Sequence, residues 1–205
     1  MQMSIRFLLI AGAAASFVLP SAAMAAGNTS NVRGTIEQIG GDTMQVKTSN
    51  GTSITVQLAQ NAKIAVVSKA SMADVKPGSF IGTAARPQPD GTLQAAEIHI
   101  FPESMRGTGE GNRPWDTGPG SSMTNGTVGQ QVDKVQGNTL TVKYQGGEKA
   151  VTVTPNTKVV ELAPGDRNDL KPNEKVFIPG ATAAGNDRFE ANRLTVGKDG
   201  VAPPM

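Results

Sequence analysis

The sequence predicts an all-β protein built from two small β-barrel modules in tandem. Three observations lead to this fold class: short runs in which apolar and polar residues alternate, frequent turn residues, and an internal repeat. Glycine and proline number 24 and 13 among 205 residues, and aromatic residues make up only 4%. This composition favours short strands joined by many turns over long helices.

The N-terminal residues have the order of a secretory signal peptide. Arg6 supplies a positive charge, residues 7–20 are apolar, and Ala23-Met24-Ala25 is an A-x-A cleavage site. The apolar run falls short of the roughly 20 residues that a membrane-spanning helix needs. We therefore expect cleavage at Ala25/Ala26, export to the periplasm, and no transmembrane segment in the mature chain.

An internal duplication covers most of the mature chain. Four stretches recur in the same order at an offset of 95 or 96 residues: 41–47 with 137–143, 61–64 with 156–159, 74–78 with 169–173, and 93–98 with 189–194. The predicted division of the chain is a signal peptide (1–25), a first module (26–100), a connector (101–124), a second module (125–198) and a disordered tail (199–205).

The first module begins with three predicted strands. The first runs from Val32 to about Ile39, and a Gly40-Gly41-Asp42 turn follows it. Apolar and polar residues alternate in 43–47 and again in 54–58, which is the period of a half-buried strand. Asn50-Gly51 between them predicts a hairpin, because both residues tolerate the positive φ of a type I′ turn.

The pattern then predicts one helical turn and a second hairpin. Ser71 and Asp74 can cap the turn, which Pro77 and Gly78 end. Two strands are expected at 80–85 and 93–100, joined by Asp90-Gly91. The second module repeats the series with expected strands at 140–144, 151–153, 175–181 and 189–196.

Five or six short strands with one late helical turn favour a small closed barrel. A sheet of this size must close or pack to hide its edges. The nearest common plan is the oligonucleotide/oligosaccharide-binding type of barrel, so we expect each module to be OB-like.

The repeated strings also resemble a known family. Gly34-Thr35-Ile36, 41–47, 74–78 and 93–98 are similar to an exported bacterial domain of unknown function, number 5666. The resemblance covers both copies. It implies a small barrel-like β fold, and it implies no activity and no functional residues.

The connector is rich in Trp, Arg and Gly, and it holds the candidate ligand-binding residues. These are Trp115, Arg113, Arg106, Glu103, Glu110 and Asp116. A flexible linker would favour Ser and Gly without Trp. We therefore expect a structured connector whose charges pair locally and whose Trp115 packs on a barrel or in the cleft between barrels. The alternative is a binding loop on a rigid scaffold.

His99 is the candidate metal ligand, since it is the only histidine. It lies between two isoleucines in a predicted strand, so we expect it to face solvent. Two other motifs are weak. Asp116-Thr117-Gly118 resembles the aspartic protease tripeptide but occurs once, whereas that chemistry needs two carboxylates sharing a proton. The glycines of 107–111 lack the following helix of a phosphate loop, because Pro114 blocks it.

Composition narrows the function. Cysteine is absent, which excludes disulfides and thiolate chemistry. Removing Arg6 with the signal leaves 18 Lys and Arg against 17 Asp and Glu. So small a charge and so few aromatic residues disfavour nucleic acid as a partner.

We expect an exported, non-enzymatic periplasmic binding or scaffold protein without a cofactor. Its partner would be a periplasmic protein or a small ligand. The alternatives are a periplasmic metal-handling accessory protein that uses His99, and a carboxylate-dependent hydrolase that uses the connector.

Overall fold

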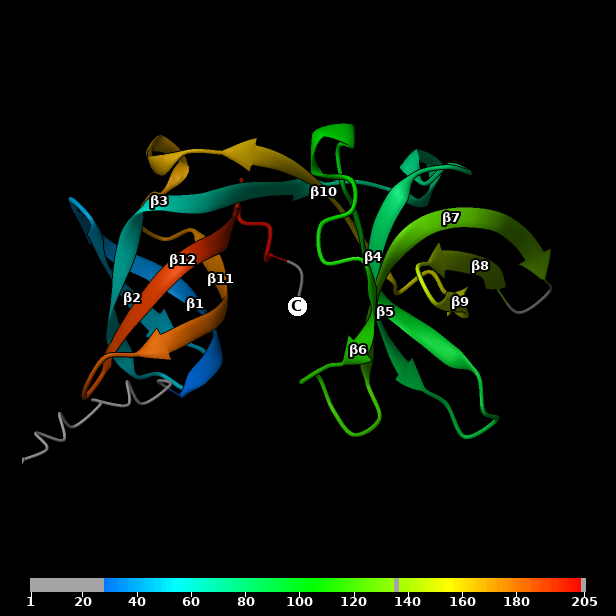
Figure 1. The fold of residues 1–205 in the computed structure, drawn as a ribbon, viewed down its shortest axis with the longest axis horizontal. Helices are drawn as coiled ribbons and strands as arrows, with labels where there is room; N and C mark the ends of the chain where they lie inside the picture. The colour runs from blue at the N-terminus through cyan, green and yellow to red at the C-terminus, as the bar shows by residue number, and fades with distance from the viewer. Residues whose placement is uncertain (1–27, 135–136, 204–205) are drawn as a thin grey trace, which may run out of the picture.

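A computed structural model describes residues 28–134 and 137–203, and the predicted signal peptide lies outside them. The described chain is all β, as the sequence predicts (Figure 1). Its strands are β1 (Thr29–Gly40), β2 (Thr43–Thr48), β3 (Ser53–Lys69), β4 (Phe80–Pro87), β5 (Leu93–Ile100), β6 (Gly111–Pro114), β7 (Ser122–Lys134), β8 (Gly137–Tyr144), β9 (Gly147–Val153), β10 (Lys158–Gly165), β11 (Lys175–Ala183) and β12 (Arg188–Gly197). Three single 3-10 turns are η1 (Met72–Asp74), η2 (Glu103–Met105) and η3 (Arg167–Asp169).

Local signals in the sequence account for these elements. In β2, Met44 and Val46 are buried while their neighbours are more exposed, as the alternation predicts. In η1, Asp74 accepts hydrogen bonds from the backbone N–H and hydroxyl of Ser71 at 2.9 and 2.7 Å. The Asn50-Gly51 hairpin is present, but only Gly51 has a positive φ (89°). The expected type I′ turn is therefore wrong, because the loop between β2 and β3 is longer than two residues.

Five strands form a closed barrel, called here the first barrel. Its order is β1-β2-β3-β12-β11 and back to β1, and all pairs are antiparallel except β3 with β12, which is parallel. One apolar cluster fills it, with Ile36, Val46, Val56, Ile178 and Val196 fully buried.

The remaining barrel strands form a second ring, called here the second barrel. Its order is β4-β5-β9-β8-β7 and back to β4, and β5 meets β9 through the single pair Gln94 and Thr152. A separate apolar cluster that includes Ile81, Ile98 and Leu140 fills this barrel. β6 adds to its outside by pairing with β7.

Each barrel draws strands from both of the sequence segments that the repeat defines. The first barrel takes β1–β3 from the first segment (29–100) and β11–β12 from the second segment (122–197). The second barrel takes β4–β5 from the first segment and β7–β9 from the second. The structure therefore differs from the expected modules 26–100 and 125–198, each closing on itself. The physical reason is that β3 continues without a break for 17 residues, which carries the following hairpin to the other barrel.

β3 and β10 cross between the barrels as an antiparallel ladder (Figure 1). Val67 pairs with Leu162 at its centre, and both side chains are buried. They belong to a third, small apolar cluster with Ala65 and Val160. The barrels are thus joined by main-chain hydrogen bonds and a core of their own.

The C-terminal residues that the structure describes do not form a disordered tail. Lys198 N–H donates to Val67 O at 2.9 Å, and Val201 packs against the apolar cluster at the crossing. Pro203 is also buried. The expectation of disorder for 199–205 is therefore wrong for residues 199–203, because the crossing strands offer an apolar surface that no single barrel would have.

Candidate functional site

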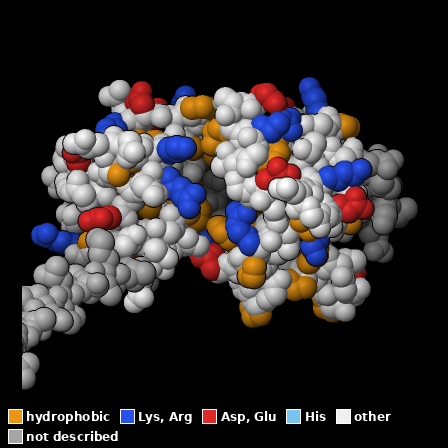
Figure 2. Space-filling view, in the orientation of Figure 1, with side chains coloured by type: hydrophobic (Ala, Val, Ile, Leu, Met, Phe, Trp, Pro, Cys, Tyr) orange, Lys and Arg blue, Asp and Glu red, His pale blue; other side chains and the backbone are white. Residues whose placement is uncertain are grey.

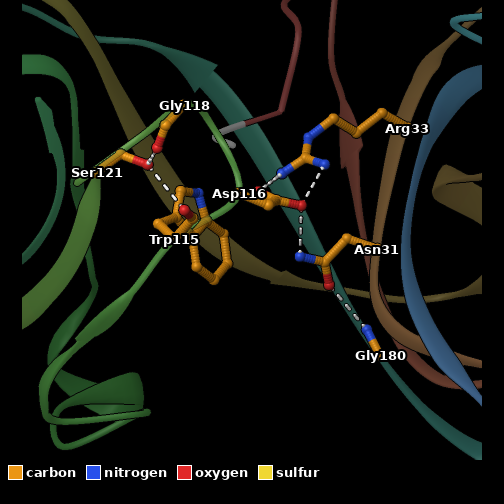
Figure 3. A network of polar contacts seen from close by, with 7 residues as sticks. All are labelled: Asn31, Arg33, Trp115, Asp116, Gly118, Ser121 and Gly180. Atoms are coloured by element: carbon orange, nitrogen blue, oxygen red, sulfur yellow. Dashed lines mark hydrogen bonds and ion pairs between the residues drawn. The ribbon is translucent and has the colours of Figure 1, made fainter.

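The connector forms a loop that reaches from the second barrel to the first. β6 fixes its direction by pairing with β7. Beyond β6, the backbone N–H of Trp115 donates to Ser121 O at 2.9 Å. The Ser121 hydroxyl lies 2.8 Å from Trp115 O and 2.7 Å from Gly118 O (Figure 3). These bonds close residues 115–121 into a compact loop.

Asp116 at the tip of this loop binds the first barrel. Its carboxylate accepts two hydrogen bonds from the Arg33 guanidinium, at 2.7 and 2.9 Å, and one from Asn31 Nδ2 at 2.9 Å (Figure 3). Asn31 in turn accepts from Gly180 N–H at 3.1 Å. The bonds from Arg33 hold the pKa of Asp116 below its usual value. The ionised Asp116 carboxylate thus links the two barrels, and the protease-like tripeptide has no free carboxyl group.

Aromatic and cationic side chains alternate beside this ion pair. The Arg113 guanidinium lies 5.6 Å from the centre of the Trp115 ring, and Trp115 meets Phe177 of the first barrel edge-on at 6.2 Å. Arg33 covers Phe177 at 4.7 Å. Trp115 is half-buried, so the structure places it between the barrels. We call Arg33, Arg113, Trp115, Asp116 and Phe177 the clasp.

The other connector candidates lie apart from the clasp. Glu103 and Arg106 form an ion pair at 2.6 Å, and Arg106 also donates to Gly78 O at 3.0 Å. The bonds from Arg106 lower the pKa of Glu103. Glu110 accepts a hydrogen bond from Gln145 N–H at 3.0 Å, next to the turn between β8 and β9. The six candidates thus divide into three places and do not line one pocket.

His99 is buried, with only 6% of its surface exposed, so the expectation of a solvent-facing side chain is wrong. Its imidazole lies against Gly82 and meets Phe101 edge-on at 5.1 Å. Burial lowers its pKa to about 3, and the Arg113 charge adds to this shift. The reason for the difference is tertiary: Phe101 and Arg113 of the connector lie beside the imidazole, and the connector has no counterpart in a lone barrel.

A surface hollow opens where the parallel seam of the first barrel is interrupted. β3 pairs with β12 at Leu58 and Ala191 and again at Lys63 and Arg193, so residues 59–62 face Asn192 alone. The hollow has a volume of about 440 Å³. Its polar lining includes Asp42, Gln57, Gln60, Glu190 and Asn192. Arg167 stands beside it, 2.8 Å from the Asp42 carboxylate.

The second barrel is hollowed at the corresponding position. Here β5 pairs with β9 at Gln94 and with β10 at Glu97, and the seam between these pairs is open. The hollow has a volume of about 280 Å³, and its polar lining includes Arg86, Gln88, Gln94, Thr154 and Asn156. The register confirms the correspondence, since Arg86 pairs with Gln94 as Thr182 pairs with Glu190.

These hollows are the feature that the sequence reasoning missed. The available signal was the pair of matched stretches 93–98 and 189–194, whose polar positions carry Gln94 and Glu190. Amide and hydroxyl groups line both hollows, and their charges differ: carboxylates in the first and a guanidinium in the second. Such linings can form hydrogen bonds with polar ligands.

The surface is also hollowed between the two barrels, where Lys and Arg side chains gather (Figure 2). Arg113 lies at this boundary: burial lowers its pKa, and the charge of Arg193 on β12 lowers it further. In residues 28–134 and 137–203, no three His, Asp or Glu side chains stand close enough to hold a metal ion. The same residues contain no helix of sufficient length and apolarity to cross a membrane.

Comparison with known proteins agrees with the resemblance seen in the sequence. Residues 33–99 match the model of a family described as a domain of unknown function (DUF5666), which supports membership of this family for the first segment. The matched range contains most of β1 and extends almost to the end of β5. Neither a curated protein nor a solved structure matches the chain.

Proposed function

We propose that this chain is an exported, non-enzymatic periplasmic binding or scaffold protein with two OB-like barrels. In chain order the strands of the first barrel are β1, β2, β3, β11 and β12. They lie around the barrel as first, second, third, fifth and fourth, and the third (β3) and fifth (β12) are parallel, which supports the OB-like description. The N-terminal signal pattern supports export.

The observation that carries the proposal is that both barrels are hollowed at corresponding breaks in their seams. Strand positions next to a break expose main-chain groups that can bond to a ligand, as well as the polar side chains around them. The clasp and the crossing strands hold the two barrels together, so the two hollows keep a fixed separation. A fixed pair of polar sites suits a partner that touches both barrels.

The contacts of Asp116, Glu103 and His99 support a non-enzymatic role. Asp116 and Glu103 are each paired with an arginine, so neither is set up as a general base. Burial of His99 as a neutral side chain also speaks against the alternative of a metal-handling protein.

The test is affinity capture from periplasmic extract with the chain as bait. Gln94→Ala and Glu190→Ala change one hollow each, and Gln38→Ala is the matched control because Gln38 is exposed on β1, outside both linings. We expect a partner that the chain and Gln38→Ala retain and that one or both hollow variants release. Equal retention by all variants would contradict a role for the hollows. Hydrolytic activity that disappears on substituting one carboxylate would contradict the non-enzymatic role.

A further inference from the structure

The hairpin β11–β12 closes the first barrel by pairing with β1, and the hairpin β4–β5 closes the second barrel by pairing with β7; the two hairpins pair in the same way. Val176 of β11 pairs with Gly34 of β1, and Ile81 of β4 pairs with Gly126 of β7. A Cβ at Gly34 would lie 2.4 Å from Lys47 O, and one at Gly126 would lie 2.2 Å from Lys143 O. Gly34 and Gly126 are therefore both required to be glycine, because the backbone of the neighbouring strand approaches each of them too closely for a side chain.

The crossing ladder is self-complementary. Lys69 pairs with Val160, and Ala65 pairs with Pro164. Under the repeat offset of 95 residues, Lys69 corresponds to Pro164 and Ala65 corresponds to Val160, so each of these pairs maps onto the other. Val67 corresponds to Leu162, and these two residues pair with each other. A contact in which equivalent residues exchange places is isologous, which is the symmetry of a twofold dimer interface.

Gly107 stands between connector residues that contact both segments, since Arg106 also donates to Thr127 Oγ1 of the second segment at 3.3 Å and Asp116 binds Arg33 of the first. On one side, Arg106 donates to Gly78 O of the first segment. On the other side, Thr108 O accepts a hydrogen bond from Asn125 Nδ2 of the second segment at 3.0 Å. Gly107 itself has a φ of 83°. A short glycine-containing hinge therefore carries the only covalent link between two segments that meet as a symmetric pair.

We propose that a second copy of this chain can supply the exchanged segment. The first segment of one chain then closes with the second segment of the other chain, and two such pairs make a closed dimer. Every strand pairing of the monomer is kept, and only the hinge takes a new path. A short linker gives an effective concentration of order mM, so the intact chain pairs with itself at micromolar concentration.

Connector length decides between the two forms. β5 and β7 flank β4, with Ile100 opposite Ile81 and Ser122 opposite Ala85. The connector of one chain must therefore span two inter-strand spacings and four residues of β4, a distance of about 17 Å. Deleting residues 103–121 leaves two residues between Ile100 and Ser122, which reach only about 11 Å. This variant can complete its barrels only with a second chain.

The first experiment measures molar mass by light scattering at about 10 µM, well below the effective concentration of the linker. We expect a monomer for the full chain, a doubled mass for the deletion variant, and a monomer when Gly and Ser replace 103–121 at equal length. A folded, monomeric deletion variant would overturn the proposal.

A cysteine pair reports which chain supplies the strand, because the chain has no native cysteine. Thr35 of β1 pairs with Lys175 of β11, so Thr35→Cys with Lys175→Cys should form a disulfide. The bond is within one chain in the full-length protein and between chains in the deletion variant. A disulfide from Thr35→Cys with Phe80→Cys instead would show that each segment closes on itself, and would refute the exchange.

A refolding experiment keeps the test decisive if the deletion variant does not fold. The full chain with the Thr35 and Lys175 cysteines is unfolded, refolded and oxidised at about 10 µM, far below the effective concentration, and at about 1 mM, close to it. We expect disulfide-linked dimers to rise at least tenfold at the higher concentration. The absence of linked dimers at about 1 mM would overturn the proposal.

Discussion

Replacing Trp115 by alanine tests whether the clasp holds the barrels together. The side chain is half-buried between the Arg113 guanidinium and the Phe177 ring. A fully buried aromatic side chain hides 150–250 Å², so half burial of an indole removes about 100 Å² from water and contributes about 2.5 kcal/mol. The edge contact with Phe177 adds about 0.5–1.5 kcal/mol. We therefore expect Trp115→Ala to lower the free energy of unfolding by about 3 kcal/mol.

The assay is urea unfolding followed by far-ultraviolet circular dichroism, because the substitution removes the only tryptophan. For a chain of this size the expected loss corresponds to a fall in melting temperature of about 6–12 °C. Trp115→Phe is the matched control, since it keeps a ring next to Phe177. Within the described residues the indole N–H is buried and donates to no acceptor. The control should therefore lose less than half as much stability as the alanine variant.

Fluorescence of the unmodified chain provides an independent readout. A ring between the barrels should emit at shorter wavelength than free tryptophan and should be quenched weakly by iodide. The reasoning would be refuted by strong iodide quenching together with an unchanged melting temperature in Trp115→Ala. That result would instead make the connector a binding loop with an exposed anchor.

Three further predictions concern other residues. Gly82→Ala should destabilise the protein by about 1–3 kcal/mol, the usual cost of overpacking, because its Cβ would lie 1.8 Å from His99 Nε2. Adding His99→Ala should recover part of this loss in a double-mutant cycle. A purely additive cycle would contradict the contact. Because Arg33 lowers the folded-state pKa of Asp116, this carboxylate should add stability above the unfolded-state pKa of about 3.9 and lose its effect as the pH falls through the folded value. The stability difference between the chain and Asp116→Asn should thus be constant from pH 7 to about pH 5 and shrink at lower pH; a difference that grows on acidification would contradict the ion pair. Mass spectrometry of exported protein should show a start near Ala26, and an intact N-terminus in the periplasmic fraction would contradict the signal peptide.

The sequence was most informative where structure depends on neighbouring residues. Alternation in 43–47 places Met44 and Val46 in the core, because successive side chains of a strand point to opposite faces. The two late hairpins were predicted within a few residues of β4, β5, β11 and β12, since turn residues mark their ends.

The candidate site was predicted only in part. The connector was expected to pack through Trp115 and to pair its charges locally; Trp115 contacts Phe177 and Glu103 pairs with Arg106, but Asp116 pairs with Arg33 of β1 instead. The structure does not gather the six candidate residues, because Glu103 pairs with Arg106 within the connector and Glu110 binds Gln145 at the turn between β8 and β9. The hollows were missed because they arise where pairs of strands separate, which depends on register between distant segments.

By itself, the sequence determined the all-β class and the approximate positions of β1, β2, β4, β5, β8, β9, β11 and β12, whereas β6, β7, β10 and the second half of β3 were not predicted. Only the tertiary structure decided which hairpin closes which barrel. The reason is that Gly34 pairs with Val176 and Gly126 pairs with Ile81 at equivalent positions, so the local pairing pattern is the same for both hairpins. The choice depends on the unbroken course of β3 past Val67, where it pairs with β10 and carries the next hairpin to the other barrel.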